Sequence, residues 1–512
     1  MLKAKSINAA GWLIFLLAIL NVALHLVFTG DLEYHRDELL YFSLGLHPAF
    51  GYATVPPMIG WIAMLMEKIF GYSLFAIRIF PALLSGVLVY LVAAIARELG
   101  GSVYSGILAA TGMVLSISGL RTYMFFMPVH IDIFFWTLSF YLLIKYVNTQ
   151  SGKYLILFGI AAGLGLLNKY LIALLFVLFL LIIPFTRHRT VFSNKYFWFG
   201  ILAGALIFMP NLIWQIVNGL PVINHMAELE RTQLVNVGRI SFLIEQLLIS
   251  GAASFLTVAG IIYLFTSRDA KKFRFIAIVT ISVIITLMIL RGKSYYTQGI
   301  FPVLIAAGSV SWERMLRRTW SRIVFVVLLI IITIPFVPAG LPIYGKDKLV
   351  VYFSYIKKHY GMDFITRFED NSIHSLPQDY ADMIGWKELA SIASRAWGMI
   401  PEKKSAFIYC ENYGEAGAVT IIGKKYGLPE AVCFNESFRY WIPEKFDPDI
   451  RSMVYINYHQ PGEDVRHLFR KITLIGSISD PDAREFGTSV YLCEEPVLSF
   501  NEFWTERTRN LR

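Results

Sequence analysis

Four acidic residues crowd an eight-residue window early in the chain, which reads Asp31-Leu-Glu33-Tyr-His-Arg36-Asp37-Glu38. The residues that follow, Leu-Leu-Tyr-Phe-Ser-Leu-Gly-Leu, form an apolar stretch typical of a helix lying on a membrane surface. Carboxylates at the start of such a helix can act as general bases on a hydroxyl group at the lipid–water boundary. The alternative interpretation is a solvated loop with a helix cap.

A further acidic residue, Asp132, opens a long apolar run in the sequence Pro128-Val-His130-Ile-Asp132. A carboxylate at this position is costly unless it faces a polar cavity or pairs with a cation such as Arg121. His130 and Asp132 could also ligate a metal ion, but two ligands make a weak metal site. We therefore predict no metal site and no tightly bound cofactor, while a requirement for a loosely held divalent metal stays open.

Basic residues interrupt the apolar sequence at several places. Lys169 separates two apolar runs, and Arg291 and Lys293 follow another. Each of these side chains alone could simply reach to the membrane surface. Together with Arg36 and Arg121, however, they make a set that suits a phosphate group at the outer face of a membrane.

The composition indicates what positions these residues. Of the 512 residues, 56% are hydrophobic and 16% are charged, whereas soluble proteins are about 45–50% apolar and about 25% charged. This excludes a disordered, a nucleic-acid-binding and an ordinary cytosolic protein. We predict a mainly α, polytopic membrane protein with about eleven spanning helices. Their approximate spans are 10–29, 79–97, 103–120, 129–147, 154–168, 170–186, 197–217, 240–266, 273–290, 296–311 and 322–340.

The basic residues also predict an orientation. Residues 1–344 contain 25 Lys and Arg against 12 acidic residues, and 16 of these 25 lie in alternate turns that begin with Lys3 and Lys5. The positive-inside rule places those turns and the N-terminus in the cytoplasm. An odd number of spans then places residues 345–512 outside the cytoplasm. The localisation expected is the cell (inner) membrane.

Residues 345–512 have a different composition, with 21 basic and 24 acidic residues and all three cysteines, Cys410, Cys433 and Cys493. Short β-rich runs at Ala406–Cys410, Met453–Tyr458, Ile472–Ile475 and Ser489–Leu492 alternate with helical stretches such as Trp386–Trp397, which predicts a small α/β domain. We therefore expect two domains, residues 1–344 and 345–512. The cysteine spacing matches no zinc or redox motif, although one disulfide is compatible with an oxidising compartment.

Several motifs together resemble bacterial members of glycosyltransferase family 39, which have the GT-C membrane fold. The similarity spans roughly residues 10–340 and rests on the order of these motifs: Tyr34-His35-Arg36-Asp37-Glu38-Leu-Leu-Tyr41, Pro56-Pro57, Arg78-Ile-Phe-Pro81-Ala82, Leu166-Leu-Asn168-Lys169-Tyr170, Arg291-Gly-Lys293-Ser-Tyr295-Tyr296 and Phe301-Pro302. The later run Asn412-Tyr413-Gly414-Glu415-Ala-Gly417 is similar to that of many bacterial relatives. Its own residues predict either a capped turn or a site for a polar ligand.

The resemblance implies transfer of a sugar from a polyprenyl-phosphate donor to a lipid, glycan or protein hydroxyl outside the cytoplasm. It implies Asp37 as the base, with Glu38 as its neighbour and possible substitute. The implied phosphate contacts are Arg36, Arg121, Lys169, Arg291 and Lys293, and the implied substrate contacts are His130, Asp132, Tyr295 and Tyr296. Relatives often carry an acidic or basic residue just before the Pro-Pro pair, where this chain has Thr54-Val55.

Two other readings remain open at this point. Many spans with ionisable residues also fit a transporter or flippase with an external binding domain. Alternatively, residues 345–512 carry the activity and the spans are only an anchor. The lack of evident paired repeats argues against the transporter, and about eleven spans are more than an anchor requires.

Overall fold

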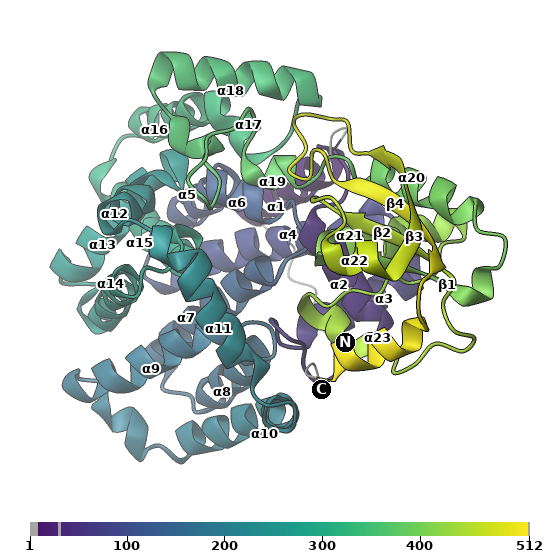
Figure 1. Ribbon diagram of the computed structural model, residues 1–512. Helices are drawn as coiled ribbons and strands as arrows, with labels where there is room; N and C mark the ends of the chain where they lie inside the picture. The colour runs from purple at the N-terminus through teal and green to yellow at the C-terminus, as the bar shows by residue number, and fades with distance from the viewer. Residues whose placement is uncertain (1–8, 29–31, 510–512) are drawn as a thin grey trace, which may run out of the picture. The chain divides into compact units, whose positions relative to one another are not determined.

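The computed structural model describes residues 9–28 and 32–509, and it is mostly helical (Figure 1). Its described residues form two compact units. The first contains the described part of Met1–Gly30 together with Val55–Ile59 and Arg78–Tyr344. The second contains the described part of Asp31–Thr54 together with Gly60–Ile77 and Gly345–Arg512. The second unit therefore combines most of the early acidic window with the C-terminal third of the sequence. Asp31, Lys3 and Lys5 lie outside the described residues.

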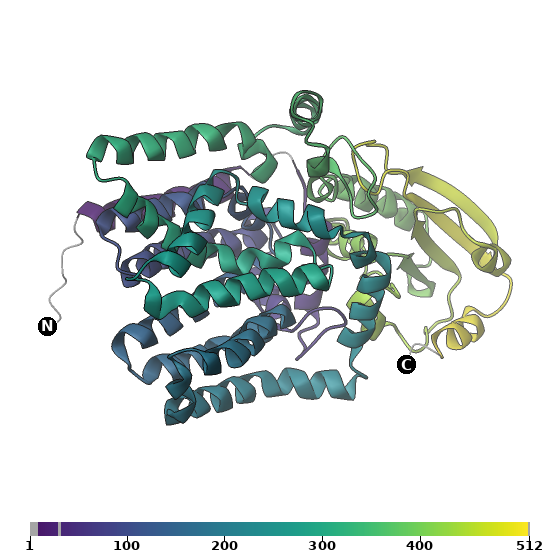
Figure 2. The same cartoon turned by 90° about the vertical axis from the view of Figure 1, so that its left-hand side faces the viewer.

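The first unit consists of helices that run alongside one another (Figures 1 and 2). They are α1 (Ala9–Val27), α4 (Leu74–Glu98, which begins in the second unit), α5 (Val103–Val114), α6 (Ile117–Thr122), α7 (Pro128–Thr149), α8 (Lys153–Leu166), α9 (Ala173–Ile182), α10 (Lys195–Val217), α11 (Pro221–Thr232), α12 (Arg239–Leu248), α13 (Ser254–Thr266), α14 (Arg274–Ile289), α15 (Phe301–Met315), α16 (Thr319–Thr333) and α17 (Val337–Gly340).

Small residues bring pairs of these helices into backbone contact. A Cβ added to Gly159 of α8 would lie 2.0 Å from the carbonyl oxygen of Gly200 in α10, and one added to Gly308 of α15 would lie 1.8 Å from that of Leu256 in α13. Glycine is required at such positions because any side chain would push the helices apart. Gly159 and Gly163 thus pack α8 closely against α10.

Five helical segments among the described residues are long and apolar enough to cross a membrane. They are Leu74–Glu98, Pro128–Thr149, Lys195–Val217, Lys271–Ile289 and Thr319–Gly340. Shorter apolar helices occupy Gly11–Val27, Val103–Val114, Lys153–Leu166 and Tyr170–Phe185. This pattern is that of a multi-pass membrane protein, but it does not confirm the predicted number of eleven spans.

One of the predicted spans is not a single continuous helix. The apolar run 240–266 is broken into Arg239–Leu248 and Gly251–Thr266, which meet at 94°. Gly251 sits at the break with a φ of +58°, a left-handed conformation that glycine adopts without strain and that ends a helix. Hydrophobicity alone does not show this turn, because both halves are apolar.

The second unit contains a four-stranded sheet with the order β1-β2-β4-β3. Its strands are β1 (Ala406–Cys410), β2 (Ser452–Asn457), β3 (Phe469–Ser477) and β4 (Ser489–Pro496). Strands β1 and β2 pair in parallel and the other two pairs are antiparallel. All four predicted strands are therefore confirmed. The three cysteines are buried and free, so the possible disulfide is not present.

Helices cover both faces of this sheet. The helices of the second unit are α2 (Arg36–Leu46), α3 (Met58–Phe70), α18 (Lys346–Tyr360), α19 (Gln378–Ala381), α20 (Trp386–Gly398), α21 (Tyr413–Gly417), α22 (Glu463–Leu468) and α23 (Phe500–Thr508). Of these, α20 and α23 lie on opposite faces of the sheet. Phe500 and Trp504 of α23 pack on Phe407 and Met453, which are paired neighbours on one face. Alternation along the strands turns Ile408 to the opposite face, where α20 contacts the sheet.

Candidate active site

The acidic window forms the start of helix α2 in the second unit. His35 is the N-cap: its Nδ1 accepts a hydrogen bond from the Asp37 backbone N–H at 3.1 Å, and its own N–H donates to the Glu38 carboxylate at 2.9 Å. This reciprocal capping box fixes the first turn. Glu38 is fully buried in this role, whereas Asp37 is half-buried. The two candidate bases therefore differ: Glu38 is occupied by the helix cap, and Asp37 is the more accessible carboxylate.

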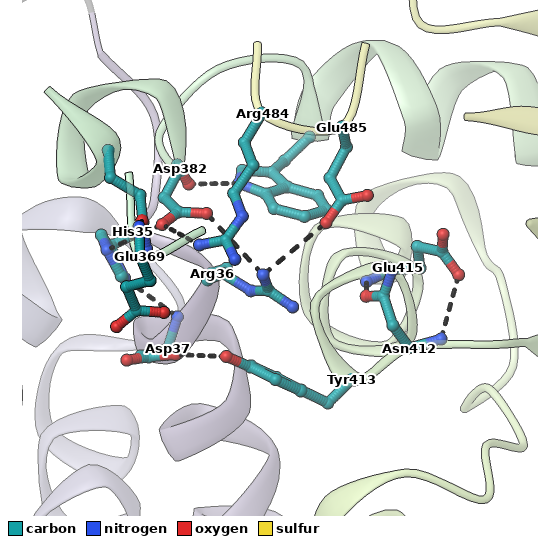
Figure 3. Close-up of polar contacts among 12 residues, drawn as sticks. His35, Arg36, Asp37, Glu369, Asp382, Asn412, Tyr413, Glu415, Arg484 and Glu485 are labelled. Carbon is teal, nitrogen blue, oxygen red and sulfur yellow. Dashed lines mark hydrogen bonds and ion pairs between the residues drawn. The ribbon is translucent and has the colours of Figure 1, made fainter. Parts of the chain in front are cut away.

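The Asp37 side chain receives a hydrogen bond from far along the sequence. The Tyr413 hydroxyl donates to Asp37 Oδ1 at 2.8 Å (Figure 3). The Arg36 guanidinium lies over the ring of the same tyrosine, 4.4 Å from its centroid. Sequence reasoning singled out the motif that contains Tyr413 but not the residue itself. No local signal could have found this contact, because 376 positions separate the two partners.

Arg36 has surroundings different from those expected of a phosphate-binding residue. Its guanidinium lies 3.9 Å from Asp382 Oδ1 and 3.8 Å from Glu485 Oε1, as Figure 3 shows. Asp382 is buried and also accepts a hydrogen bond from Arg484 at 2.9 Å. Burial raises the pKa of Asp382, and the neighbouring Arg484, His35 and Arg36 oppose that shift. The Arg36 charge is therefore already balanced by carboxylates within its own unit.

The Asn412–Gly417 run is a capped helix, as one of the two interpretations predicts. The Asn412 side chain accepts from the Glu415 N–H at 3.0 Å, and the Glu415 carboxylate accepts from the N–H groups of Glu411 and Asn412. A Cβ on Gly417 would lie 2.8 Å from Leu39 Cβ of α2. Gly417 and the capping box thus place α21 directly against α2, which brings Tyr413 to Asp37.

A second carboxylate acts on Asp37 from the turn that begins the short 3-10 helix η13 (Glu436–Trp441). Glu436 accepts a hydrogen bond from Thr54 Oγ1 at 2.5 Å, and Ser437 Oγ accepts from the Ala53 N–H at 3.0 Å. Burial raises the pKa of Glu436 to about 7; the Thr54 hydrogen bond opposes the shift and Asp37 adds to it. Thr54, noted as a departure from relatives, therefore pairs with an acid that sequence reasoning missed.

His130 and Asp132 lie together near the start of α7 in the first unit. Asp132 Oδ1 accepts from the Trp136 indole N–H at 3.1 Å, and His130 Nδ1 accepts from the Met127 N–H at 3.3 Å. Both are buried. The His130 ring is enclosed by aromatic residues, and its Nε2 has no hydrogen-bond partner within residues 9–28 and 32–509. Among the described residues no group of three or more His, Cys, Asp or Glu side chains is arranged to hold a metal ion.

The structure brings together another part of the predicted set, also within the first unit. The Lys169 ammonium lies 5.2 Å from the ring centroid of Tyr295 and 4.9 Å from that of Tyr296, both in η7 (Ser294–Ile300). Asp132 and Lys293 are its electrostatic neighbours. Cation–π contacts of this kind hold an ammonium group without neutralising it. The Lys169 ammonium therefore faces two tyrosine rings, with one carboxylate and one further lysine as charged neighbours.

The remaining predicted cations are more dispersed. Lys293 donates to Gln233 Oε1 at 2.5 Å, and the exposed Arg291 donates to the Val235 carbonyl at 3.0 Å. Arg121 is half-buried in the last turn of α6. The contacts of Lys293 and Arg291 tie them to the segment between α11 and α12. The structure thus brings Lys169, Tyr295 and Tyr296 together, with Lys293 as an electrostatic neighbour of Lys169.

Known proteins match both the sequence and the fold. Residues 54–214 match the family described as dolichyl-phosphate-mannose-protein mannosyltransferase. The lipid A galacturonosyltransferase RgtD of Rhizobium johnstonii is 24% identical over 306 residues, which cover 57% of this chain and 62% of that protein. The alignment thus spans less than two thirds of this relative. The resemblance to glycosyltransferase family 39 is confirmed.

Solved structures share the fold of this family-39-like chain. The crystal structure of ArnT from Cupriavidus metallidurans, bound to undecaprenyl phosphate, has a TM-score of 0.59 at 14% identity and covers 95% of this chain and 98% of ArnT. The arabinofuranosyltransferase AftD from Mycobacteria has a TM-score of 0.54 at 12% identity, with 96% of this chain and 40% of AftD covered. The predicted GT-C fold is therefore confirmed. RgtD and AftD are named for the transfer of a sugar.

Proposed function

We propose that this protein is a membrane glycosyltransferase that moves a sugar from a polyprenyl-phosphate donor to an acceptor hydroxyl outside the cytoplasm. The observation that carries the proposal is the start of α2, where Glu38 is committed to the helix cap while half-buried Asp37 receives the Tyr413 hydrogen bond. The family match and the shared GT-C fold support the reaction class. The undecaprenyl phosphate bound to ArnT supports a polyprenyl-phosphate donor.

Asp37 is the base in this proposal. As the acceptor oxygen attacks the anomeric carbon, its proton passes to the Asp37 carboxylate. The bond between that carbon and the phosphate oxygen breaks, and its electron pair leaves with polyprenyl phosphate. A phosphate is a good leaving group that needs cations more than a proton. A single displacement of this kind inverts the anomeric configuration.

Among the other predicted residues, only Arg36 and Glu38 receive roles that differ from the predicted ones. Lys169 and Lys293, with Arg291 and Arg121, stabilise the donor phosphate, and Arg36 instead organises the start of α2 through its carboxylate partners. Glu38 holds the helix cap.

Tyr295, Tyr296, Asp132 and His130 contact the sugar or the acceptor. Buried polar atoms such as His130 Nε2 support this role, because a buried nitrogen without a partner is costly unless a ligand supplies one.

The membrane topology completes the proposal. About eleven spans, a cytoplasmic N-terminus and an extracytoplasmic segment 345–512 follow from hydropathy and the positive-inside rule. The chain then has a transmembrane domain, 1–344, and a C-terminal domain, 345–512, in the cell (inner) membrane. An active site on the outer face needs a lipid-linked donor, since nucleotide sugars are not expected there. The acceptor is a lipid, a glycan or a protein.

Purified protein in detergent tests the reaction class. Incubation with a panel of radiolabelled polyprenyl-phosphate sugars, with and without EDTA, should release free polyprenyl phosphate from one donor. Binding of each donor is measured in the same samples. Absence of both release and binding for every donor would contradict the proposal. Uptake of a polar substrate into empty proteoliposomes without a covalent product would support a transporter instead.

A further inference from the structure

The hydroxyl of Tyr413 sits where it controls the orientation of Asp37. We propose that Tyr413 is a positioning residue for the base: its hydrogen bond holds Oδ1 of Asp37, so that Oδ2 is presented to the acceptor hydroxyl. This inference rests on the proposed function and deepens it. It assigns a role at the base to a residue of the C-terminal segment, whereas Asp37 itself belongs to the early acidic window.

The hydrogen bond has the ordinary length of a bond between a hydroxyl and an oxygen acceptor. At 2.8 Å between the phenol oxygen and Asp37 Oδ1, it is a charge-assisted O–H···O bond to a half-buried carboxylate. The backbone N–H of Asp37 is already bonded to His35 Nδ1, so the main chain of the residue is fixed as well. With its backbone and one oxygen held, the carboxylate has little freedom to rotate.

Tyr413 is itself held on three sides. It is the first residue of α21, whose N-terminus is fixed by the Asn412 and Glu415 capping box. The Arg36 guanidinium covers its ring. The close contact between Gly417 and Leu39 locks α21 against α2, the helix that carries Asp37. A tyrosine held in this way is preorganised, so the bond costs little entropy when the substrate arrives.

The charges around Tyr413 keep its hydroxyl a donor. The groups that act on it are Arg36, Asp37, Glu436 and Asp382. Burial raises the pKa of Tyr413 well above its usual value; Arg36 opposes this shift, while the three carboxylates add to it. The phenol therefore stays protonated throughout the pH range in which an enzyme of this kind is assayed. It stabilises the ionised form of Asp37, which is the form that accepts a proton.

The chain offers a matched control. Tyr455 of β2 is buried where Tyr413 is half-buried, and its hydroxyl donates to a carboxylate, Glu411 Oε1, at 2.9 Å and accepts from Asn457 Nδ2 at 2.8 Å. Replacing either tyrosine with phenylalanine removes one phenol and one tyrosine–carboxylate hydrogen bond from the second unit. Only the change at Tyr413 touches Asp37. A general weakening of the fold would therefore affect both variants, and a loss of positioning would affect one.

The experiment compares Tyr413→Phe with Tyr455→Phe in full-length protein, using the labelled donor that the wild type turns over. We expect kcat to fall about 10- to 100-fold in Tyr413→Phe, with KM for the donor within about twofold of wild type and the melting temperature close to that of Tyr455→Phe. The acidic limb of the kcat profile should move to higher pH, because the ionised carboxylate loses a donor. Incorporation of 3-fluorotyrosine at position 413 should move that limb to lower pH, since a more acidic phenol donates more strongly.

Two results would overturn the inference. One is a wild-type kcat and pH profile in Tyr413→Phe; the other is an equal loss of kcat in Tyr455→Phe. If Tyr413→Phe fails to fold, the direction of the fluorotyrosine shift decides the matter, and no shift would reject the role. Failure of the underlying function is distinguishable, because the wild type itself would then release no polyprenyl phosphate from any donor.

Discussion

Replacing Gly417 with alanine should disturb the site without introducing any charge or backbone strain. The residue has a φ of −63° and a ψ of −40°, which alanine adopts readily. The added methyl group would lie 2.8 Å from Leu39 Cβ and 3.1 Å from the Leu39 carbonyl carbon, where ordinary contact begins at 3.4 Å. Helix α21 must therefore move from α2 by about 0.6 Å.

The magnitude follows from two opposing effects. Overpacking a tight contact costs about 1–3 kcal/mol, and replacing a helical glycine with alanine returns up to about 1 kcal/mol. The net loss of stability is up to about 2 kcal/mol, which lowers the melting temperature by up to several degrees. A displacement of α21 also lengthens the 2.8 Å bond between Tyr413 and Asp37, so kcat should fall as well.

Thermal unfolding in detergent and donor turnover would be measured on the same preparations. Gly398→Ala is the control, because a methyl group there would meet nothing within 4 Å at the end of helix α20. That variant should be as stable as wild type or slightly more stable, with unchanged turnover. Wild-type stability and turnover in Gly417→Ala would refute the packing argument.

Two other predictions concern charged groups. Lys169→Gln should raise the donor KM about tenfold or more with little change in melting temperature, because it removes the charge and shortens the side chain by only one atom. Unchanged donor affinity in a binding assay would contradict the phosphate role. Burial raises the pKa of Glu436 to about 7 from an unfolded value of 4.5, so the folded state binds the extra proton and stability falls as pH rises from about 4.5 to about 7. The loss in the free energy of unfolding amounts to about 3 kcal/mol. Glu436→Gln should therefore make stability less dependent on pH between about 4.5 and 7. The same pH dependence of unfolding in this variant and in wild type would contradict the prediction.

Local sequence patterns predicted much of the fold. The four strands could be predicted because β-rich runs and turn residues alternate in the C-terminal segment. The spacing of Asn412 and Glu415 is a capping pattern that can be recognised from the sequence alone. These features depend on neighbours in the chain, so they are readable without a structure.

The contacts that define the site depend on distant residues. Tyr413 and Asp37 come from opposite ends of the sequence, as do Thr54 and Glu436. The carboxylates that surround Arg36 lie more than 300 positions away, which is why its charge looked free for a phosphate. The turn at Gly251 was hidden for a different reason, since the two arms of the broken helix together pass as one apolar segment.

The role of Asp37 is the central claim, and one pair of variants tests it most directly. Asp37→Asn keeps the shape of the side chain but removes its ability to accept a proton. Asp347→Asn makes the same change at a carboxylate that is 94% exposed on α18 and serves as the control. We predict that Asp37→Asn still binds the labelled donor but transfers sugar about 100- to 10,000-fold more slowly, while Asp347→Asn transfers at the wild-type rate. Transfer at the wild-type rate by Asp37→Asn would contradict the account.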